Sequence, residues 1–91
     1  MNEGKIELRE SVKWFAEQME TRLKQNDYRG GWNKEILTDL YFYLEKQQKE
    51  LKNALYEHYG KMNNKRLIKE AVDLANYAMM IAENAKNGSG V

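Results

Sequence analysis

The side chains with the clearest chemical potential recur at three-residue spacing in an otherwise apolar stretch, KEAVDLANYAMMIAE at 69–83. Glu70, Asp73 and Asn76 fall on one face of a helix, because positions three and four apart lie about one turn from each other. Two carboxylates therefore lie close to, or inside, the surface that this helix is expected to bury.

Three interpretations of Glu70 and Asp73 are open on this pattern. In the first, they pair at the edge of the apolar face with bases such as Arg66 or Lys69, and exposed pairs of that kind contribute roughly 0–1 kcal/mol. In the second, they form a buried polar network that fixes the register of the helices. Or they bind Mg²⁺, which takes hard oxygen ligands and is commonly held by one or two carboxylates together with substrate phosphates.

A metal site needs a further acid from another part of the chain. Glu50, preceded at three-residue spacing by Gln47, is the best candidate. Packed helices lie about 8–10 Å apart from axis to axis, so acids on facing stripes can share an ion. The combined pattern is Gln47-x-x-Glu50 followed by Glu70-x-x-Asp73.

Three predicted helices position these side chains. Each has apolar residues at spacings of three and four, and loops rich in Asn and Gly separate them. The first helix is expected over about 6–25, the second from a cap at Asn33 to about 58, and the third from a cap at Asn63 or Asn64 to about 86. No β-strand pattern is present, so we predict an all-α antiparallel bundle.

The length of 91 residues allows one small domain, expected over 1–87, with a flexible tail at 88–91. Hydrophobic residues make up 42% and charged residues 32% of the chain. That balance gives a helical monomer a thin core, and small bundles of this kind often complete their core by pairing with another copy. We therefore expect a homodimer, or a dimer of dimers.

Charge and composition exclude several classes of function. The formal net charge of +1 lacks the basic excess that duplex nucleic-acid binding usually requires. The chain has no cysteine and a single histidine, which excludes thiolate and histidine metal sites. No apolar run approaches the roughly 20 residues that span a bilayer, and the start MNEGKIELRE has no apolar signal-peptide core. The expected location is the cytoplasm, with no membrane contact.

The pattern resembles the MazG-like all-α nucleoside triphosphate pyrophosphohydrolases, whose signature is Glu-x-x-Glu on one helix and Glu-x-x-Asp on a later one. FAEQMETRLKQNDYRGGW at 15–32 is similar to the start of a short subfamily common in bacteriophage and bacterial genomes, in which an Asn-Asp-x-x-Gly-Gly-Trp loop follows the first helix. ELKNAL at 50–55 and EAVDLANYAMMIAE at 70–83 resemble its second and third blocks. The resemblance covers most of the chain.

The resemblance implies Mg²⁺-dependent hydrolysis of a nucleoside triphosphate, in particular a deoxynucleotide, to the monophosphate and pyrophosphate, with Mn²⁺ as a substitute metal. It implies that Glu50, Glu70 and Asp73 are the catalytic metal ligands, with Gln47 as a further candidate. Asn76 would orient a phosphate or a metal-bound water. The remaining candidates for substrate binding are basic side chains near the start of the third helix and aromatic side chains of the loop: Lys61, Lys65, Arg66, Lys69, Trp32 and Tyr28.

The chain departs from the family pattern at two positions. Gln47 stands where the family has its first Glu, and Lys46 stands where an acid is common. A Gln carbonyl can bind Mg²⁺ but brings no charge, and Lys46 can pair with Glu50 four residues later. The alternative function is therefore a nucleotide-binding or structural helical protein of the same fold in which catalysis is lost.

Overall fold

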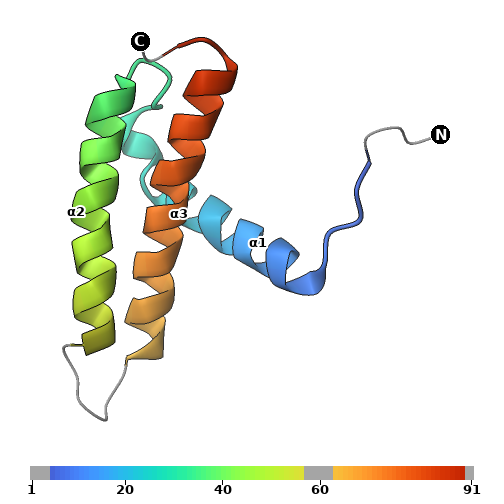
Figure 1. The fold of residues 1–91 in the computed structure, drawn as a ribbon. Coiled ribbons are helices and arrows are strands. Elements are labelled where there is room, and N and C mark those ends of the chain that lie inside the picture. The colour runs from blue at the N-terminus through green and yellow to red at the C-terminus, as the bar shows by residue number, and fades with distance from the viewer. Residues whose placement is uncertain (1–4, 57–62, 90–91) are drawn as a thin grey trace.

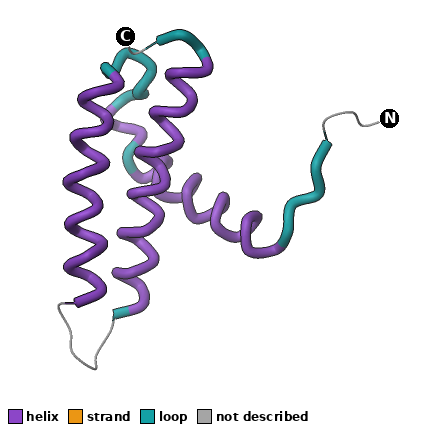
Figure 2. Tube along the Cα trace, in the orientation of Figure 1, coloured by secondary structure: helices purple, strands orange, loops and turns teal. Residues whose placement is uncertain are grey.

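The structure is a computed structural model that describes residues 5–56 and 63–89. Its elements are α1 (Glu10–Gln25), a short 3₁₀ turn η1 (Asp27–Arg29), α2 (Leu37–Tyr56) and α3 (Asn64–Lys86) (Figure 1). The part of the chain described here contains helices and loops and no strand (Figure 2). The predicted all-α class is confirmed.

Helices α2 and α3 lie side by side, and the chain runs along them in opposite directions (Figure 1). Helix α1 crosses this pair at a steep angle and packs on α3. Only the end of α1 that leads into η1 lies against α3, and its other end projects away (Figures 1 and 2). Helix α3 thus packs on both other helices, close to the loop that contains η1 and joins α1 to α2.

Helix α1 begins at Glu10, later than the predicted start at residue 6. Arg9 is extended and its side chain makes no capping hydrogen bond, although its backbone oxygen accepts from Val12 and Lys13. Ile6 is 80% exposed and Leu8 is 55% exposed. Without a cap or a packing surface, the extra turn has no interaction to offset the cost of ordering it.

Helix α2 begins at Leu37, so the prediction that Asn33 caps it is wrong. Asn33 lies in a turn in which the backbone N–H of Glu35 donates to the oxygen of Trp32, and the first helical hydrogen bond joins Leu40 to Ile36. The predicted end of this helix, at about 58, lies outside the described residues.

Helix α3 begins as predicted, because the side chain of Asn63 accepts a hydrogen bond from the backbone N–H of Arg66 at 3.1 Å. After Lys86 the chain reverses at Gly88, whose φ of +70° is a left-handed conformation that glycine adopts without steric cost. The backbone N–H of Ser89 then donates to the oxygen of Asn84 at 2.8 Å. The predicted tail therefore starts within the cap of α3, and residues 90–91 lie outside the described part.

The core of the described residues is small and unusually polar. Its fully buried apolar residues are Leu40, Ala54 and Val72, and its buried polar residues are Glu70, Asn76 and Asn84. Helix α1 contributes no buried residue. Half of this buried set is polar, and its hydrogen bonds join α3 to α2, to α1 and to the loop before α2. Among residues 5–56 and 63–89, no helix combines the length and apolarity needed to cross a bilayer.

Candidate functional site

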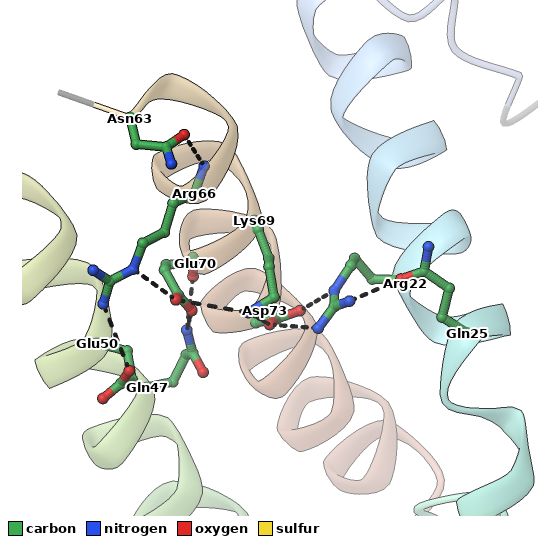
Figure 3. Close-up of polar contacts among 9 residues, drawn as sticks. All are labelled: Arg22, Gln25, Gln47, Glu50, Asn63, Arg66, Lys69, Glu70 and Asp73. Carbon is green, nitrogen blue, oxygen red and sulfur yellow. Dashed lines mark hydrogen bonds and ion pairs between the residues drawn. The ribbon is translucent and has the colours of Figure 1, made fainter. Parts of the chain in front are cut away.

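Three carboxylates and three cationic side chains alternate across the faces where the helices meet (Figure 3). The acids are Glu50 on α2 and Glu70 and Asp73 on α3, the three predicted catalytic residues. In order from α2 to α1, the row reads Glu50, Arg66, Glu70, Lys69, Asp73 and Arg22. The sequence pattern thus located three acids that belong to one connected site.

Gln47 joins α2 to this row by the closest contact that Glu70 makes. Its Nε2 group donates to Oε1 of Glu70 at 2.8 Å and to the backbone oxygen of Glu70 at 3.1 Å (Figure 3). Glu70 is only 5% exposed, so its carboxylate requires hydrogen-bond partners to offset the loss of water. A glutamine supplies a donor at this place, whereas a glutamate would present a second negative charge.

Arg66 and Lys69 approach the acids at longer distances. The Nε atom of Arg66 lies 3.5 Å from Oε2 of Glu70, and its Nη2 lies 3.9 Å from Oε1 of Glu50. Nζ of Lys69 lies 3.7 Å from Oε2 of Glu70 and 3.9 Å from Oδ2 of Asp73. Each cation therefore lies between two carboxylates without a short contact to either one.

The surroundings of Glu70 act on its pKa in opposite directions. Burial raises the pKa, whereas the hydrogen bond from Gln47 and the positive charges of Lys69 and Arg66 lower it. The lowering contributions prevail, so the pKa of Glu70 lies below its ordinary value. Glu70 is consequently an ionised carboxylate at neutral pH despite its burial.

Asp73 makes a two-point ion pair with Arg22 of α1, a residue that the sequence analysis missed. Nε and Nη2 of Arg22 donate to the two carboxylate oxygens of Asp73 at 2.8 and 2.9 Å. The hydrogen bond to Asp73 also raises the pKa of Arg22, against burial, which lowers it. Its spacing was a usable signal, because Arg22 follows Met19 of the predicted apolar face by three residues and so shares that face. In the structure both side chains are half-buried.

As arranged, the described residues hold no group of three acids or histidines close enough to bind one metal ion. Arg66 separates Glu50 from Glu70, and Lys69 bridges Glu70 and Asp73. The predicted ligands are therefore neighbours that share cations. Gln47 points its amide nitrogen, the end that cannot bind a metal, toward Glu70.

A cavity of about 530 Å³ adjoins this row beneath the Gly-Gly-Trp loop. Its aromatic lining comes from Trp32, Tyr43 and Tyr77. Gln47 and Asp73 also line it, so the cavity and the row of acids share side chains. Volumes of about 300–1,000 Å³ with a few placed polar groups are typical of small-molecule sites.

Helix α3 fixes the loop that covers this cavity. Nδ2 of Asn84 donates to the backbone oxygens of Trp32 and Glu35, at 2.9 and 3.3 Å. The indole N–H of Trp32 donates to Oε1 of Glu83 at 3.0 Å. Trp32 therefore lines the cavity with its ring held by its own hydrogen bond, and its binding role stays a prediction. Neither Glu83 nor Asn84 was a predicted site residue.

The other four predicted substrate-binding residues lie in different places. Asn76 lines the cavity, and its Nδ2 donates to the backbone oxygen of Met19 at 3.2 Å. Tyr28 does not line it: its side chain is 78% exposed and contacts the Arg29 guanidinium. Lys65 is exposed on the first turn of α3. Lys61 lies outside the described residues.

A second cavity, of about 480 Å³, lies on the α2 side of the row. It shares Gln47, Tyr43 and Tyr77 with the first cavity. Its charged lining residues are Lys46, Lys49 and Glu50. Lys46, the second departure from the family pattern, therefore lines a cavity next to Glu50 and places its ammonium 5.5 Å from the centre of the Phe42 ring.

Comparison of the chain with family models, with curated proteins and with solved structures finds no match in any of the three. The resemblance to the MazG-like family accordingly stays a prediction from the residue pattern.

Proposed function

We propose that this chain is a magnesium-dependent pyrophosphohydrolase of nucleoside triphosphates, in particular deoxynucleoside triphosphates, acting in the cytoplasm. The observation that carries the proposal is the union of two features. The carboxylates of Glu50, Glu70 and Asp73 form one row, and a cavity walled by aromatic rings shares Asp73 and Gln47 with that row. Acids beside an aromatic cavity suit a ligand with an anionic, metal-binding end and a flat ring.

The donor set and its charge fit Mg²⁺, or Mn²⁺ in its place. Carboxylate oxygens are the ligands that Mg²⁺ prefers. Arg66 and Lys69 together bring two positive charges to these acids, the charge of one Mg²⁺ ion. Their contacts with these three acids are 3.5–3.9 Å long and their side chains are 29% and 48% exposed, so a metal ion would displace them from the acids at low cost. Glu50, Glu70 and Asp73 would hold the metal if their side chains then came closer together and Asp73 shared its carboxylate with Arg22. Gln47 would add a neutral oxygen if its amide rotated.

Bound metal supplies charge neutralisation at the phosphates and a water of lowered pKa. The chain's own residues have separate tasks. The rings of Trp32, Tyr43 and Tyr77 would hold the base in the larger cavity. Arg66 and Lys69, once displaced from the acids, would face the triphosphate, with Lys65 on the same end of α3. Lys46 and Lys49 of the second cavity would add positive charge on the α2 side.

A specific observation favours the alternative function, nucleotide binding without hydrolysis. Gln47, where the family pattern has an acid, is the closest partner of Glu70, and every acid of the row already has a cationic partner. A site with one carboxylate fewer binds metal more weakly, because its affinity comes from negative charge. In this alternative the cavity binds the nucleotide and the acids only join the helices.

The deciding experiment measures pyrophosphate release from all common NTPs and dNTPs, with and without Mg²⁺. The test variant is Glu70→Gln, and the matched control is Glu45→Gln, which removes an exposed carboxylate from α2. Release that requires both Mg²⁺ and Glu70, and survives Glu45→Gln, supports the enzyme. Thermal stabilisation by nucleotide without release supports the binding protein. If the protein shows no pyrophosphate release and no stabilisation by nucleotide, both proposals are contradicted.

We also propose that the chain acts as a homodimer, or as a dimer of dimers. One face of α1 carries Val12, Phe15, Met19 and Leu23 at spacings of three and four. Phe15, Met19 and Leu23 are half-buried, whereas Val12, in the first turn of α1, is 46% exposed. That end of α1 projects away from α3 (Figure 1). A second copy that covers this continuation would enlarge a core whose buried apolar residues are few.

A further inference from the structure

Asn76 is a buried amide at the larger cavity with one half of its hydrogen-bonding capacity in use. It is 4% exposed, lies one turn after Asp73 on α3, and lines the cavity. Its Nδ2 donates to the backbone oxygen of Met19 at 3.2 Å. Its Oδ1 has no hydrogen-bond partner among the residues that the structure describes. A buried polar atom without a partner is uncommon and calls for a physical reason.

The contact with Met19 determines which end of the Asn76 amide is left without a hydrogen-bond partner among the described residues. A backbone oxygen can only accept, so the NH₂ group of Asn76 must face Met19. A rotation that exchanged the two ends would bring two oxygens together. The end that remains unpaired is therefore an acceptor suited to a group that carries a hydrogen. Because this oxygen is itself buried, a ligand in the cavity would reach it by displacing the side chains that cover it.

The other walls of the cavity narrow the ligand to a flat ring. Trp32, Tyr43 and Tyr77 line it, and the Trp32 indole is held by its hydrogen bond to Glu83. Aromatic walls bind planar rings by stacking. An acceptor among aromatic walls suits a nucleobase, because each natural base carries an N–H on its pairing edge.

We propose that Asn76 is a specificity-determining residue whose Oδ1 accepts a hydrogen bond from an N–H of the bound nucleobase. The protein would then reject bases that lack this hydrogen, such as unsubstituted purine or N3-methylated thymine. The inference rests on the proposed function only in taking the ligand to be a nucleotide. It goes further in naming the atom that recognises the base, and it does not require hydrolysis.

A purely structural role for Asn76 makes a different prediction. If the side chain only joins α3 to α1 through its hydrogen bond to Met19, its replacement weakens the binding of all ligands by the same factor. If Oδ1 contacts the base, its replacement removes the preference for the hydrogen-bearing base. The ratio of two dissociation constants, and not affinity itself, separates these roles.

Nucleoside titrations by calorimetry, without Mg²⁺ or phosphates, measure this ratio. The pairs are deoxyadenosine against purine deoxyriboside, and thymidine against N3-methylthymidine. In the unsubstituted protein we expect the analogue that lacks the hydrogen to bind at least about tenfold more weakly, because the site's acceptor is then left unpaired. The chain has two tryptophans, so a Trp14→Phe background leaves Trp32 as the only indole, and its fluorescence reports binding at the cavity.

The test variants are Asn76→Asp, which keeps an oxygen acceptor, and Asn76→Leu, which removes it at similar size. Both lose the amide donor to Met19, so they differ in the acceptor. Asn84→Leu is the matched control, because Asn84 is also buried with an unpaired Oδ1 but does not line the cavity. We expect Asn76→Leu to bring the ratio close to one and Asn76→Asp to preserve it. Asn84→Leu should weaken both members of a pair equally, since it loosens the loop that holds Trp32.

Equal binding of both members by the unsubstituted protein overturns the inference, and that measurement does not depend on whether a variant folds. Three other outcomes also overturn it: a ratio of dissociation constants that is unchanged in Asn76→Leu, a preference that follows the sugar hydroxyls instead of the base, and the absence of nucleoside binding. Failure of the proposed function has a different signature. Pyrophosphate release is then absent while nucleoside binding keeps its dependence on Asn76.

Discussion

Nε2 of Gln47 donates to both Oε1 and the backbone oxygen of Glu70, at 2.8 and 3.1 Å, so one side chain of α2 is bound to one residue of α3 at two points. This is the position at which the sequence departs from the family pattern. The neutral amide stabilises a buried carboxylate that a second acid would repel in the absence of metal. The departure thus has a structural consequence as well as a functional one.

Replacing this amide by a carboxylate should make the stability of the protein depend on metal. In EDTA we expect Gln47→Glu to lower the free energy of unfolding by about 1–3 kcal/mol, because it removes a donor from a buried acid and adds a like charge. Millimolar Mg²⁺ should restore the free energy of unfolding, and pyrophosphate release by Gln47→Glu should be preserved or increased. Thermal unfolding with and without MgCl₂ measures this. Gln48→Glu, at the exposed neighbouring position, is the control and should respond little to metal.

The ion pair between α1 and α3 should carry measurable stability. Arg22 and Asp73 are joined by two short hydrogen bonds, and their side chains are 26% and 17% exposed. We expect Arg22→Ala to lower the free energy of unfolding by about 1–3 kcal/mol, as for other hydrogen bonds to charged groups. Lys24→Ala, at an exposed site on the same helix, should change it by less than about 0.5 kcal/mol in urea titrations. Equal effects would mean that the pair contributes nothing specific.

The lowered pKa of Glu70 predicts a loss of stability in acid. A carboxylate whose pKa is lower in the folded than in the unfolded state stabilises the fold above the unfolded value, 4.5 for a free Glu. That contribution disappears as the pH falls through the folded pKa, because the unfolded state then binds more protons than the folded state. Melting temperatures measured between neutral pH and about pH 3 should fall less steeply for Glu70→Gln than for the unsubstituted protein. Parallel curves would show that Glu70 gains nothing from its partners.

Metal and basic side chains should compete for the same acids. Lys69 lies between Glu70 and Asp73, so Lys69→Ala should raise Mg²⁺ affinity in the absence of nucleotide by roughly three- to tenfold, the scale of about 1 kcal/mol for a partly exposed ion pair. The same variant should raise KM for a triphosphate, which loses a cation. Lys65→Ala, at an exposed site one turn earlier, should leave Mg²⁺ affinity unchanged. Calorimetric titration with Mg²⁺ measures these affinities. A lower Mg²⁺ affinity in Lys69→Ala contradicts the proposal that metal and Lys69 compete for the same acids.

The uncovered part of α1 should be a contact between copies. We expect Val12→Glu to shift the protein from dimer to monomer and to lower its melting temperature, because it places a charge on an apolar face. Lys13→Gln changes the net charge by the same amount at an exposed position and should leave the assembly intact. Sedimentation velocity over a concentration series measures both. A monomer at all concentrations in the unsubstituted protein contradicts the proposed dimer.

The sequence by itself determined the helical class, the approximate extents of the helices, the cap at Asn63, and the helices that carry Glu50, Glu70 and Asp73. These features depend on local rules: apolar spacing, the side chains that cap helices, and glycine at reversals. The same rules placed Ile6 and Leu8 in a helix, which failed because nothing in the described residues covers them. They also placed a cap at Asn33, which failed because the amide of Asn84 binds the backbone of that loop from α3.

Tertiary structure alone decided which side chains meet. Asp73 pairs with Arg22, 51 positions earlier, and Tyr43 and Tyr77, rather than the predicted Tyr28, line the cavity. Spacing along a chain shows which residues share a face, but not which face of another helix they will meet. That choice depends on the crossing of α1 over α3 and on the burial of Glu70. The buried carboxylate of Glu70 accepts hydrogen bonds from α2 and from its own helix, since each unmet hydrogen bond would cost free energy.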